Sequence, residues 1–193
     1  MIAPRLLFAL DAVARSLILR GIPGAIVECG VWNGGSAALL AAAAREAGSA
    51  RRVWAFDSFE GLPRPTDRDP EAIRRHYFKG WNRGNPEKVR EIWSRLGLPP
   101  EDLVIRRGWF HETFPTAPEG PVALLHIDSD WYESVKICLA AWFDRISPGG
   151  VVILNDYNLY SGANEALHEF LEERALQVAI HPMGRAGAWF EKP

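Results

Sequence analysis

The sequence predicts one α/β domain built around a mostly parallel sheet. Strand-like and helix-like segments alternate along the 193 residues, and the last two strand-like segments have no helix between them. Such alternation is typical of parallel sheets with helices on both faces, and the final pair should form an antiparallel hairpin. The composition, 48% hydrophobic and 24% charged, is that of an ordinary globular domain. We see no internal repeat and expect residues 1–193 to form a single domain.

Five helices and seven strands are expected. The helices lie at residues 4–20, 36–48, 86–97, 131–146 and 162–174, and the strands at 25–30, 52–57, 103–108, 121–128, 150–156, 176–180 and 187–191. Charges in the first helix recur at helical intervals, which favours an amphipathic helix over an export signal. Ser36 can cap the second helix and Gly48 can end it. The SPGG sequence at 147–150 predicts a turn.

Residues 58–85 form a long polar segment rich in proline, aspartate and arginine. A loop of this length in a compact domain is usually functional or disordered. Its aromatic residues, among them Tyr77 and Trp81, favour a functional role. We expect this segment to be a lid that closes over a bound substrate and excludes water from it.

Charge and hydropathy bound the class of protein. The net charge of −2 gives no sign of a nucleic-acid-binding surface. No apolar run reaches the ~20 residues that a membrane-spanning helix needs. Cys29 and Cys138 both lie in apolar segments, which is typical of reduced core cysteines. We therefore expect a cytoplasmic protein that binds neither nucleic acid nor membranes.

Acidic side chains recur at the carboxyl ends of the predicted strands. The residues at these ends are Glu28, then Asp57, then Gly108 with Trp109, then Asp128 with Asp130, and finally Asn155 with Asp156. Open parallel sheets bind ligands outside these ends, so the side chains should gather at one edge. Clustered carboxylates repel one another unless cations or donors lie among them. The pattern predicts a cationic ligand, a metal ion, or both.

The first two strand ends indicate what that ligand is. An acidic residue at the position of Asp57 fits the ribose hydroxyls of a nucleotide. The glycines at 30, 34 and 35 allow close approach of the backbone, but their spacing is not the GxGxxG of dinucleotide sites. Together with Glu28, this favours a cofactor bearing an ammonium group, such as S-adenosylmethionine, over one bearing a pyrophosphate.

The last two strand ends offer oxygen ligands for a metal ion. Asp128, Asn155 and Asp156 suit a hard divalent cation such as Mg²⁺ or Ca²⁺ rather than zinc. The alternative is structural: Asp156 caps the loop after its strand and Asn155 satisfies the backbone.

Five segments resemble, in order, the signatures of the macrocin O-methyltransferase family. They are VECGVWNGGS, VWAFDSFEGLP, RRGWFHETFP, LLHIDSDWYES and SPGGVVILNDY, and the resemblance spans about residues 25 to 190. It implies a Rossmann-like S-adenosylmethionine-dependent methyltransferase fold with a seven-stranded sheet and a C-terminal antiparallel hairpin. It also implies a Mg²⁺-dependent enzyme that methylates a hydroxyl of a sugar or related natural product, and a homodimer.

The resemblance assigns roles to residues. Glu28 would bind the methionine part of the cofactor, in a pocket formed with Gly30, Val31, Trp32, Gly34 and Ser36. Asp57 would bind the ribose beside Ser58 and Phe59, and Gly108 and Trp109 would flank the adenine. Asp128, Asn155 and Asp156 fall on the metal positions, Asp128 also being placed with the cofactor-binding and catalytic residues. His76 looks placed like the family's base, which would take the proton of the acceptor hydroxyl.

One departure from the family pattern leaves alternatives open. The family usually has two aspartates where this chain has Asn155-Asp156, so the metal site loses one negative charge. A homologue that binds the cofactor without catalysing transfer is therefore one alternative. A nicotinamide-dependent oxidoreductase is another, although the glycine spacing counts against it.

Overall fold

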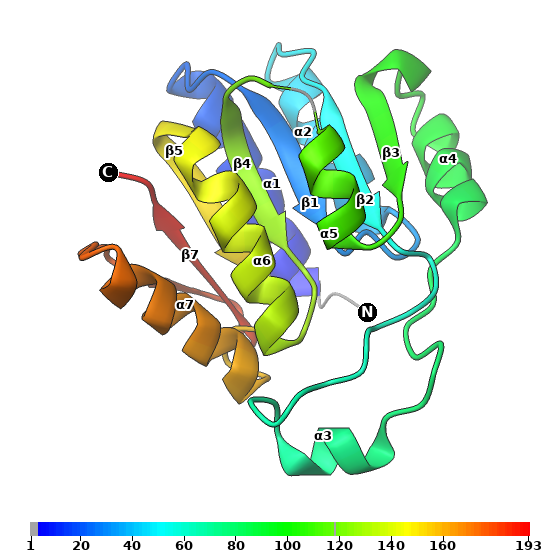
Figure 1. Cartoon of the computed structure of the whole chain (residues 1–193). Helices are drawn as coiled ribbons and strands as arrows, with labels where there is room; N and C mark the ends of the chain where they lie inside the picture. The colour runs from blue at the N-terminus through cyan, green and yellow to red at the C-terminus, as the bar shows by residue number, and fades with distance from the viewer. Residues whose placement is uncertain (1–3, 118) are drawn as a thin grey trace.

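A seven-stranded sheet runs through the molecule, with helices on both faces (Figure 1). This computed structural model describes residues 4–117 and 119–193. The strands are β1 (Ala25–Cys29), β2 (Val53–Asp57), β3 (Leu103–Arg107), β4 (Val122–Ile127), β5 (Ile146–Leu154), β6 (His181–Met183) and β7 (Gly187–Glu191). They lie in the order β3-β2-β1-β4-β5-β7-β6; the pairings of β7 with β5 and with β6 are antiparallel, and the other four are parallel. The predicted α/β class and the terminal hairpin are confirmed.

The helices divide between the two faces of the sheet. They are α1 (Pro4–Leu19), α2 (Gly35–Glu46), α3 (Glu71–His76), α4 (Pro86–Arg95), α5 (Phe110–Thr113), α6 (Tyr132–Trp142) and α7 (Ser161–Glu173). One apolar core joins α1, α2 and α4 to the sheet, and a second joins α6 and α7 to its other face. No helix in the described part of the chain is long and apolar enough to cross a bilayer.

Alternation along each strand decides which core a side chain joins. In β1, Ile26 belongs to the core with α1 and α2, whereas Val27 belongs to the core with α6 and α7. By the same alternation Glu28 lies on the face of Ile26, and Cys29 on the face of Val27. The free Cys29 and Cys138 are both buried, as expected of core cysteines.

Two local predictions differ from the structure. Residues 176–180 form no strand, and β6 begins only at His181. The alternation in 176–180 has another cause, since Leu176, Val178 and Ile180 pack against the core formed with α6 and α7. The SPGG turn is part of β5, which already begins at Ile146. The pairing with β4 shifts register there, and this accommodates the extra residues.

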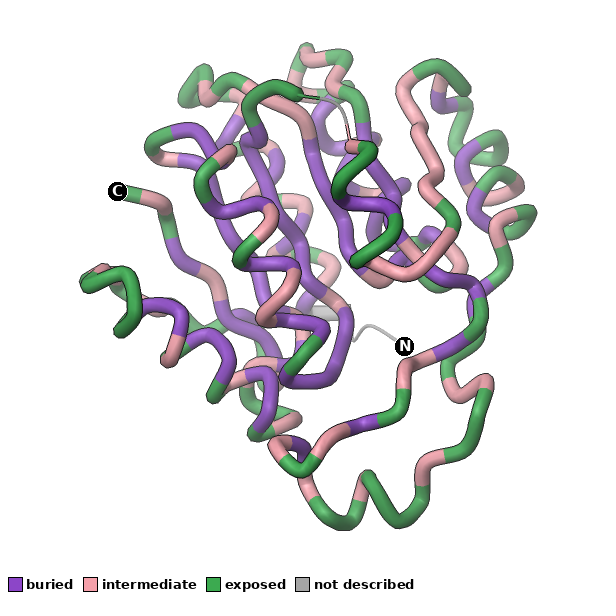
Figure 2. Tube along the Cα trace, in the orientation of Figure 1, coloured by how far each residue is buried: buried purple, intermediate pink, exposed green. Residues whose placement is uncertain are grey.

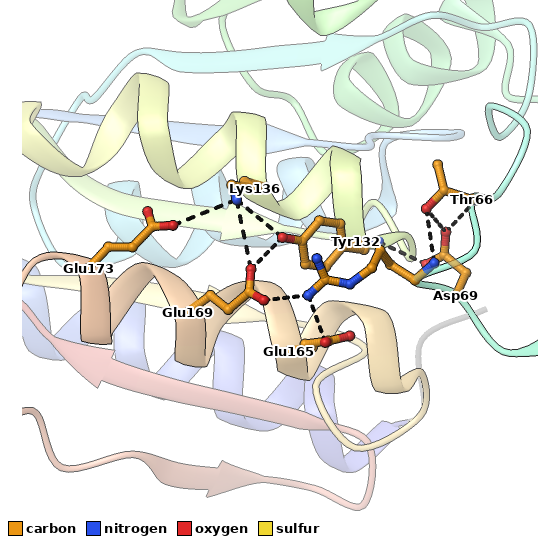
Figure 3. A network of polar contacts seen from close by, with 8 residues as sticks. Thr66, Asp69, Tyr132, Lys136, Glu165, Glu169 and Glu173 are labelled. Atoms are coloured by element: carbon orange, nitrogen blue, oxygen red, sulfur yellow. Dashed lines mark hydrogen bonds and ion pairs between the residues drawn. The ribbon is translucent and has the colours of Figure 1, made fainter.

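The segment 58–85 leaves the sheet edge, carries the unexpected short helix α3 and returns before α4 (Figure 1). Most of its residues are exposed or half-buried, in contrast to the strands (Figure 2). It is fastened at Asp69, whose carboxylate accepts the backbone N–H of Tyr132 at 2.9 Å and that of Thr66 at 2.8 Å (Figure 3). Asp69 therefore caps the start of α6 from a distant part of the chain.

Ion pairs extend this attachment to α7 (Figure 3). Arg68 pairs with Glu165 at 2.6 Å and with Glu169, and its guanidinium lies 4.1 Å from the centre of the Tyr132 ring. The Tyr132 hydroxyl in turn donates to Glu169. The attachment holds the segment to α6 and α7 at residues 66–69, on one side of α3.

Candidate active site

A cavity of about 440 Å³ opens at the carboxyl edge of the sheet. It lies where the strand order reverses, between β1 and β4, which is where open α/β sheets bind ligands. Among the described residues, four aspartates line it and no lysine, arginine or histidine does; the four are Asp57, Asp128, Asp130 and Asp156. The cavity therefore suits a ligand, or a pair of ligands, with positive charge.

The turn after β1 supplies one wall and requires glycine at two positions. Gly30 has a φ of +90°, and a Cβ there would lie 1.9 Å from the carbonyl oxygen of Asp128. Gly34 has a φ of +84°, and its Cβ would lie 2.7 Å from Val89 of α4. Gly30 thus lets β1 and β4 approach at the cavity, whereas Gly34 serves the packing of α4 and does not line the cavity.

Asp57 ends β2 and reaches the turn after β1. Its Oδ2 accepts the backbone N–H of Trp32 at 2.8 Å, and its Oδ1 accepts that of Phe59 at 2.6 Å. Each oxygen keeps a lone pair, so the carboxylate can still accept two hydroxyls of a bound diol. Burial raises the pKa of Asp57, and the backbone donors oppose that rise.

The end of β3 supplies a further wall. Gly108 and Trp109 line the cavity near Ser58, and the N–H of Gly108 donates to the carbonyl of Asp57 at 3.0 Å. The N–H of Trp109 donates to the carboxylate of Glu112 at 3.0 Å, which ties the backbone of Trp109 to the first turn of α5. These hydrogen bonds tie the backbone at Gly108 and Trp109 to β2 and to α5, with both residues in the cavity wall.

A carboxylate cluster lies beyond β4 and β5. Asp128, Asp130 and Asp156 each offer an oxygen within 4.8 Å of the others. The amide nitrogen of Asn155 donates to Asp128 Oδ1 at 2.9 Å and to Asp156 Oδ2 at 3.4 Å. The Asn155 Oδ1 is buried without a hydrogen-bond partner. A half-turn of the Asn155 amide would exchange its nitrogen and oxygen and add an oxygen to the three carboxylates.

The cluster has the electrostatics of like charges in a buried place. Burial raises the pKa of Asp128 and of Asp130, and the charge of Asp156 raises both further. Tyr160 faces the cluster, and burial together with these carboxylates raises its pKa to about 12. Either protons or a cation must offset the repulsion.

Two residues of this region, Asn82 and Tyr160, were missing from the sequence analysis, which named Asp130 at a strand end but gave it no role of its own. Asp130 adopts a φ of +61°, which turns the chain after β4 and keeps its carboxylate beside that of Asp156. Asn82 lies next to Asp130, and Tyr160 follows β5. The Asp-x-Asp spacing after β4 was a signal for Asp130. Asn82 had no local signal, because only the fold of segment 58–85 brings it to the cavity.

Glu28 lies behind the cavity rather than in its wall. It is fully buried on β1, the strand register places it beside His126 of β4, and neither side chain lines the cavity. The hydroxyl of Ser36, which does line the cavity, donates to Glu28 Oε1. Ser36 was expected to cap α2, but the N-cap residue is Gly34. Its hydroxyl is used to hold Glu28 instead.

The remaining predicted residues divide clearly. Those that line the cavity are Gly30, Val31, Trp32, Ser36, Asp57, Ser58, Gly108, Trp109, Asp128, Asn155 and Asp156. Those that do not are Glu28, Gly34, Phe59 and His76. Phe59 is buried in the core with α1 and α2. His76 is exposed at the end of α3, and its Nδ1 lies 2.7 Å from the carbonyl oxygen of Ala72.

Comparison with known proteins shows the origin of this arrangement. Residues 1–192 match the Macrocin-O-methyltransferase (TylF) family. The chain belongs to this family. A relative from Streptomyces olivaceus, the "8-demethyl-8-(2,3-dimethoxy-alpha-L-rhamnosyl)-tetracenomycin-C 4'-O-methyltransferase", is 37% identical over 98% of this chain and 74% of its own length. The "Mycinamicin III 3''-O-methyltransferase" of Micromonospora griseorubida is 32% identical over 100% of this chain and 78% of its own.

Solved structures agree with the macrocin O-methyltransferase assignment. The O-methyltransferase NovP superposes with a TM-score of 0.87 at 28% identity, covering 97% of this chain and 79% of NovP. CalS11, a calicheamicin methyltransferase, superposes with a TM-score of 0.78 at 24% identity, covering 96% and 77%. The chain thus has the fold of S-adenosylmethionine-dependent methyltransferases and is an O-methyltransferase. This family membership replaces the nicotinamide-dependent interpretation.

Proposed function

We propose that this O-methyltransferase moves a methyl group from S-adenosylmethionine to a hydroxyl of a sugar or glycosylated natural product, assisted by a divalent cation such as Mg²⁺. One observation carries the proposal. A single cavity joins the Asp57 carboxylate and the turn at Gly30 to the carboxylate cluster. A cofactor on the first side and a hydroxyl on the second would lie next to each other, as direct transfer requires.

The names of the relatives support the acceptor class. The Streptomyces olivaceus protein is a 4'-O-methyltransferase of a rhamnosyl-tetracenomycin, and the Micromonospora protein is a 3''-O-methyltransferase of mycinamicin III. A hydroxyl on a sugar of a natural product is thus the simplest acceptor for this chain.

The residues near β1, β2 and β3 fit S-adenosylmethionine, which supplies an activated methyl group on a sulfonium. Asp57 would accept the two ribose hydroxyls with the lone pairs that its backbone donors leave free. Trp109 and Gly108 would flank the adenine. The absence of a basic side chain from the described cavity wall suits a cation.

The residues beyond β4 and β5 fit a divalent cation, which supplies Lewis-acid activation of a hydroxyl. Asp128, Asp156 and Asn155 would hold it, with the Asn155 amide turned so that its unpartnered oxygen faces the carboxylates. All of these donors are oxygen atoms, which is the preference of Mg²⁺. The loss of one charge at Asn155 predicts weaker affinity than three carboxylates would give.

Asp130 is the best-placed group to take the acceptor proton. Its carboxylate lines the cavity inside the carboxylate cluster, so a hydroxyl held by the proposed cation would lie close to it. His76 stays a prediction as base, since α3 would have to move to bring its ring to the cavity. With a hydroxylated glycoside as acceptor, we expect Asp130→Asn to lower kcat by at least about 100-fold and His76→Ala to change it little. The reverse pattern would restore His76 as the base.

Asn155 favours one second candidate, a homologue that binds the cofactor without transferring methyl groups. Calorimetry with S-adenosylhomocysteine and transfer of labelled methyl to a panel of glycosides separate the two. Binding together with Mg²⁺-dependent transfer supports the enzyme, and binding with no transfer to any glycoside, with or without Mg²⁺, supports the non-catalytic homologue.

A homodimer located in the cytoplasm stays part of the proposal. The family resemblance motivates the dimer, and the two buried free cysteines motivate the reducing compartment. Sedimentation of the purified chain tests the dimer, and a monomer across micromolar concentrations would contradict it.

A further inference from the structure

Asn82 belongs to segment 58–85 and yet lies in the cavity wall beside Asp130. Its side chain lies in hydrogen-bonding contact with the Asp130 carboxylate, and this contact opposes the rise in the pKa of Asp130 that burial causes. The backbone of Asn82 has a φ of +56°, a left-handed conformation that asparagine tolerates better than most residues. An amide group is therefore held next to the carboxylate cluster by a part of the chain that is remote from it in sequence.

Trp81, the residue before Asn82, is fastened to two other parts of the chain. The N–H of Leu62 donates to the carbonyl of Trp81 at 2.7 Å, and a Cβ on Gly61 would lie 2.6 Å from that carbonyl oxygen. The Trp81 ring packs edge-on against that of Trp131, with the ring centres 6.2 Å apart. Trp131 is the N-cap residue of α6. These contacts hold the Asn82 amide at the carboxylate cluster through the fold itself.

Asp130 lies at the centre of a tight three-residue turn. The N–H of Trp131 donates to the carbonyl of Ser129 at 2.7 Å, and Asp130 between them has a φ of +61°. Such a turn is strained for a residue with a side chain, and strain of this kind is concentrated at functional sites. The turn brings the Asp130 carboxylate beside that of Asp156. It does not by itself decide whether the Asp130 carboxylate serves a metal ion or an acceptor.

Two roles compete for the Asp130 carboxylate. Asp128, Asp130 and Asp156 each offer an oxygen within 4.8 Å of the others, so on distance alone all three could hold the proposed cation. A carboxylate that coordinates a cation is a weak base, because the positive charge favours its ionised form. Asp130 can therefore take the acceptor proton only if it stays outside the ligand set. The Asn82 amide donates to this carboxylate and so engages a lone pair that a cation would otherwise take.

We propose that Asn82 is a positioning residue that keeps the Asp130 carboxylate out of the metal's ligand set and facing the acceptor hydroxyl. The inference rests on the proposed cation and on Asp130 as the base, and it adds the group that separates their roles. Without the amide, Asp130 should turn to the cation as a third carboxylate ligand. The cation would then bind more tightly, while the acceptor hydroxyl would lose its base. A side chain that only supported the fold would weaken both functions when removed.

Asn82→Gly tests this split, because glycine adopts a left-handed φ without strain. We expect Mg²⁺ or Mn²⁺, titrated into the full chain by calorimetry, to bind about tenfold more tightly, since ligand charge tunes oxygen sites. With a hydroxylated glycoside as acceptor, kcat should fall by about 100-fold or more, because a positioned base contributes that much. Asn85→Gly is the matched control. It makes the same substitution at an exposed N-cap outside the cavity, where glycine is tolerated, and should change neither quantity.

A double variant identifies the group that gains the metal. If Asp130 supplies the added affinity, Asn82→Gly should tighten metal binding in the wild type and leave it unchanged in the Asp130→Asn background. The single variants give a second comparison, since Asp130 and Asp156 are both buried. Asp156→Asn should weaken metal binding by about tenfold or more, and Asp130→Asn by about threefold or less, because only the first removes a ligand.

The outcomes separate this inference from the proposed function. A wild type that binds neither Mg²⁺ nor Mn²⁺ would overturn the proposed cation itself. A wild type that binds them, with an Asn82→Gly variant that binds them no more tightly, would overturn the role of Asn82 and leave the cation in place. If Asn82→Gly does not fold, Asp130→Asn and Asp156→Asn decide the point. Equal losses would place Asp130 among the ligands and overturn the inference, whereas a large loss for Asp156→Asn alone supports it.

Discussion

The two ends of the cavity are built in different ways. The end near β1 and β2 comes from two short stretches, residues 28–36 and 57–59, in which backbone N–H groups and glycines fix the geometry. The end beyond β4 and β5 combines the strand tips with Asn82 and Tyr160, from two other parts of the chain. At the first end, each Asp57 carboxylate oxygen accepts a backbone N–H, from Trp32 and from Phe59. The second holds three mutually repelling carboxylates.

This difference shows what each end is suited for. A preformed, hydrogen-bonded pocket binds one ligand with little reorganisation, which suits a cofactor used by every member of a family. A cluster of mutually repelling carboxylates beside a long, mostly exposed segment suits the proposed cation and acceptor. Variation in segment 58–85 can therefore change the acceptor without disturbing the cofactor pocket.

The largest expected effect is on stability, at the tight turn after β1. Gly30→Ala would force a Cβ to within 1.9 Å of the Asp128 carbonyl at a positive φ. We expect this to lower the free energy of unfolding by about 3 kcal/mol or more, since strain and overlap add. Urea unfolding measures it.

Gly35→Ala is the matched control for Gly30→Ala. An added Cβ at Gly35 meets nothing within 4 Å, and its φ is not positive. Its stability should differ from wild type by less than about 0.5 kcal/mol. If both variants lose the same free energy of unfolding, the close approach of β1 and β4 at Gly30 is not the cause of the loss.

The next largest effect concerns Asp69, which attaches segment 58–85 to the start of α6. Asp69→Ala leaves the buried N–H of Tyr132 without its cap, which should cost about 1–2 kcal/mol. Hydrogen exchange should speed up in residues 64–85 and at the start of α6, but not in the turn after β1. The exposed Asp67→Ala is the control. Faster exchange at Gly30 in Asp69→Ala would mean that the two ends are not independent.

The charge of the carboxylate cluster gives a smaller effect. Asn155→Asp restores a fourth carboxyl group, and ligand charge tunes the affinity of oxygen sites for divalent cations. We expect calorimetry to show Mg²⁺ or Mn²⁺ binding about tenfold more tightly, and the metal-free variant to unfold at lower urea because repulsion increases. If Asn155→Asp binds the metal no more tightly than wild type does, the side chain at position 155 is not a metal ligand.

The smallest effect is the pH dependence of the first end. Burial raises the pKa of Asp57 above its ordinary value of 3.8, so the native state holds this proton more tightly than the unfolded chain does. The contribution of Asp57 to stability should therefore fall as pH rises from about 3.8 through the raised pKa. The difference in unfolding free energy, wild type minus Asp57→Asn, should decrease over this window. An increase would mean that the backbone N–H donors lower the pKa of Asp57 by more than burial raises it.

The sequence predicted the first end better because its signals are local. The glycines after β1, the acid after β2 and the indole after β3 lie next to the strands they follow, so their positions depend on strand ends alone. Glu28 is the exception. Alternation along β1 directs its side chain to the face of Ile26 and α2, and the side chain therefore reaches the cavity only through Ser36.

The second end was predicted in part. Asp128, Asn155 and Asp156 follow strands and were found, whereas Asn82 depends on how segment 58–85 folds. That segment contains α3 without an apolar face to announce it; none of its residues is buried. His76 was chosen for its chemistry, but the fold leaves it on the surface of this helix. The chemistry of a residue alone cannot predict how far its side chain lies from the cavity.

Binding of S-adenosylhomocysteine to wild type and to Asp57→Ala is the most direct test of the central claim. Calorimetry should show binding in the micromolar range for wild type and a loss of at least about tenfold for Asp57→Ala, because the ribose hydroxyls lose their charged acceptor. Adding Mg²⁺ should change the wild-type affinity little, since the proposed metal ligands lie at the other end of the cavity. No binding to the wild type under any condition would contradict the account.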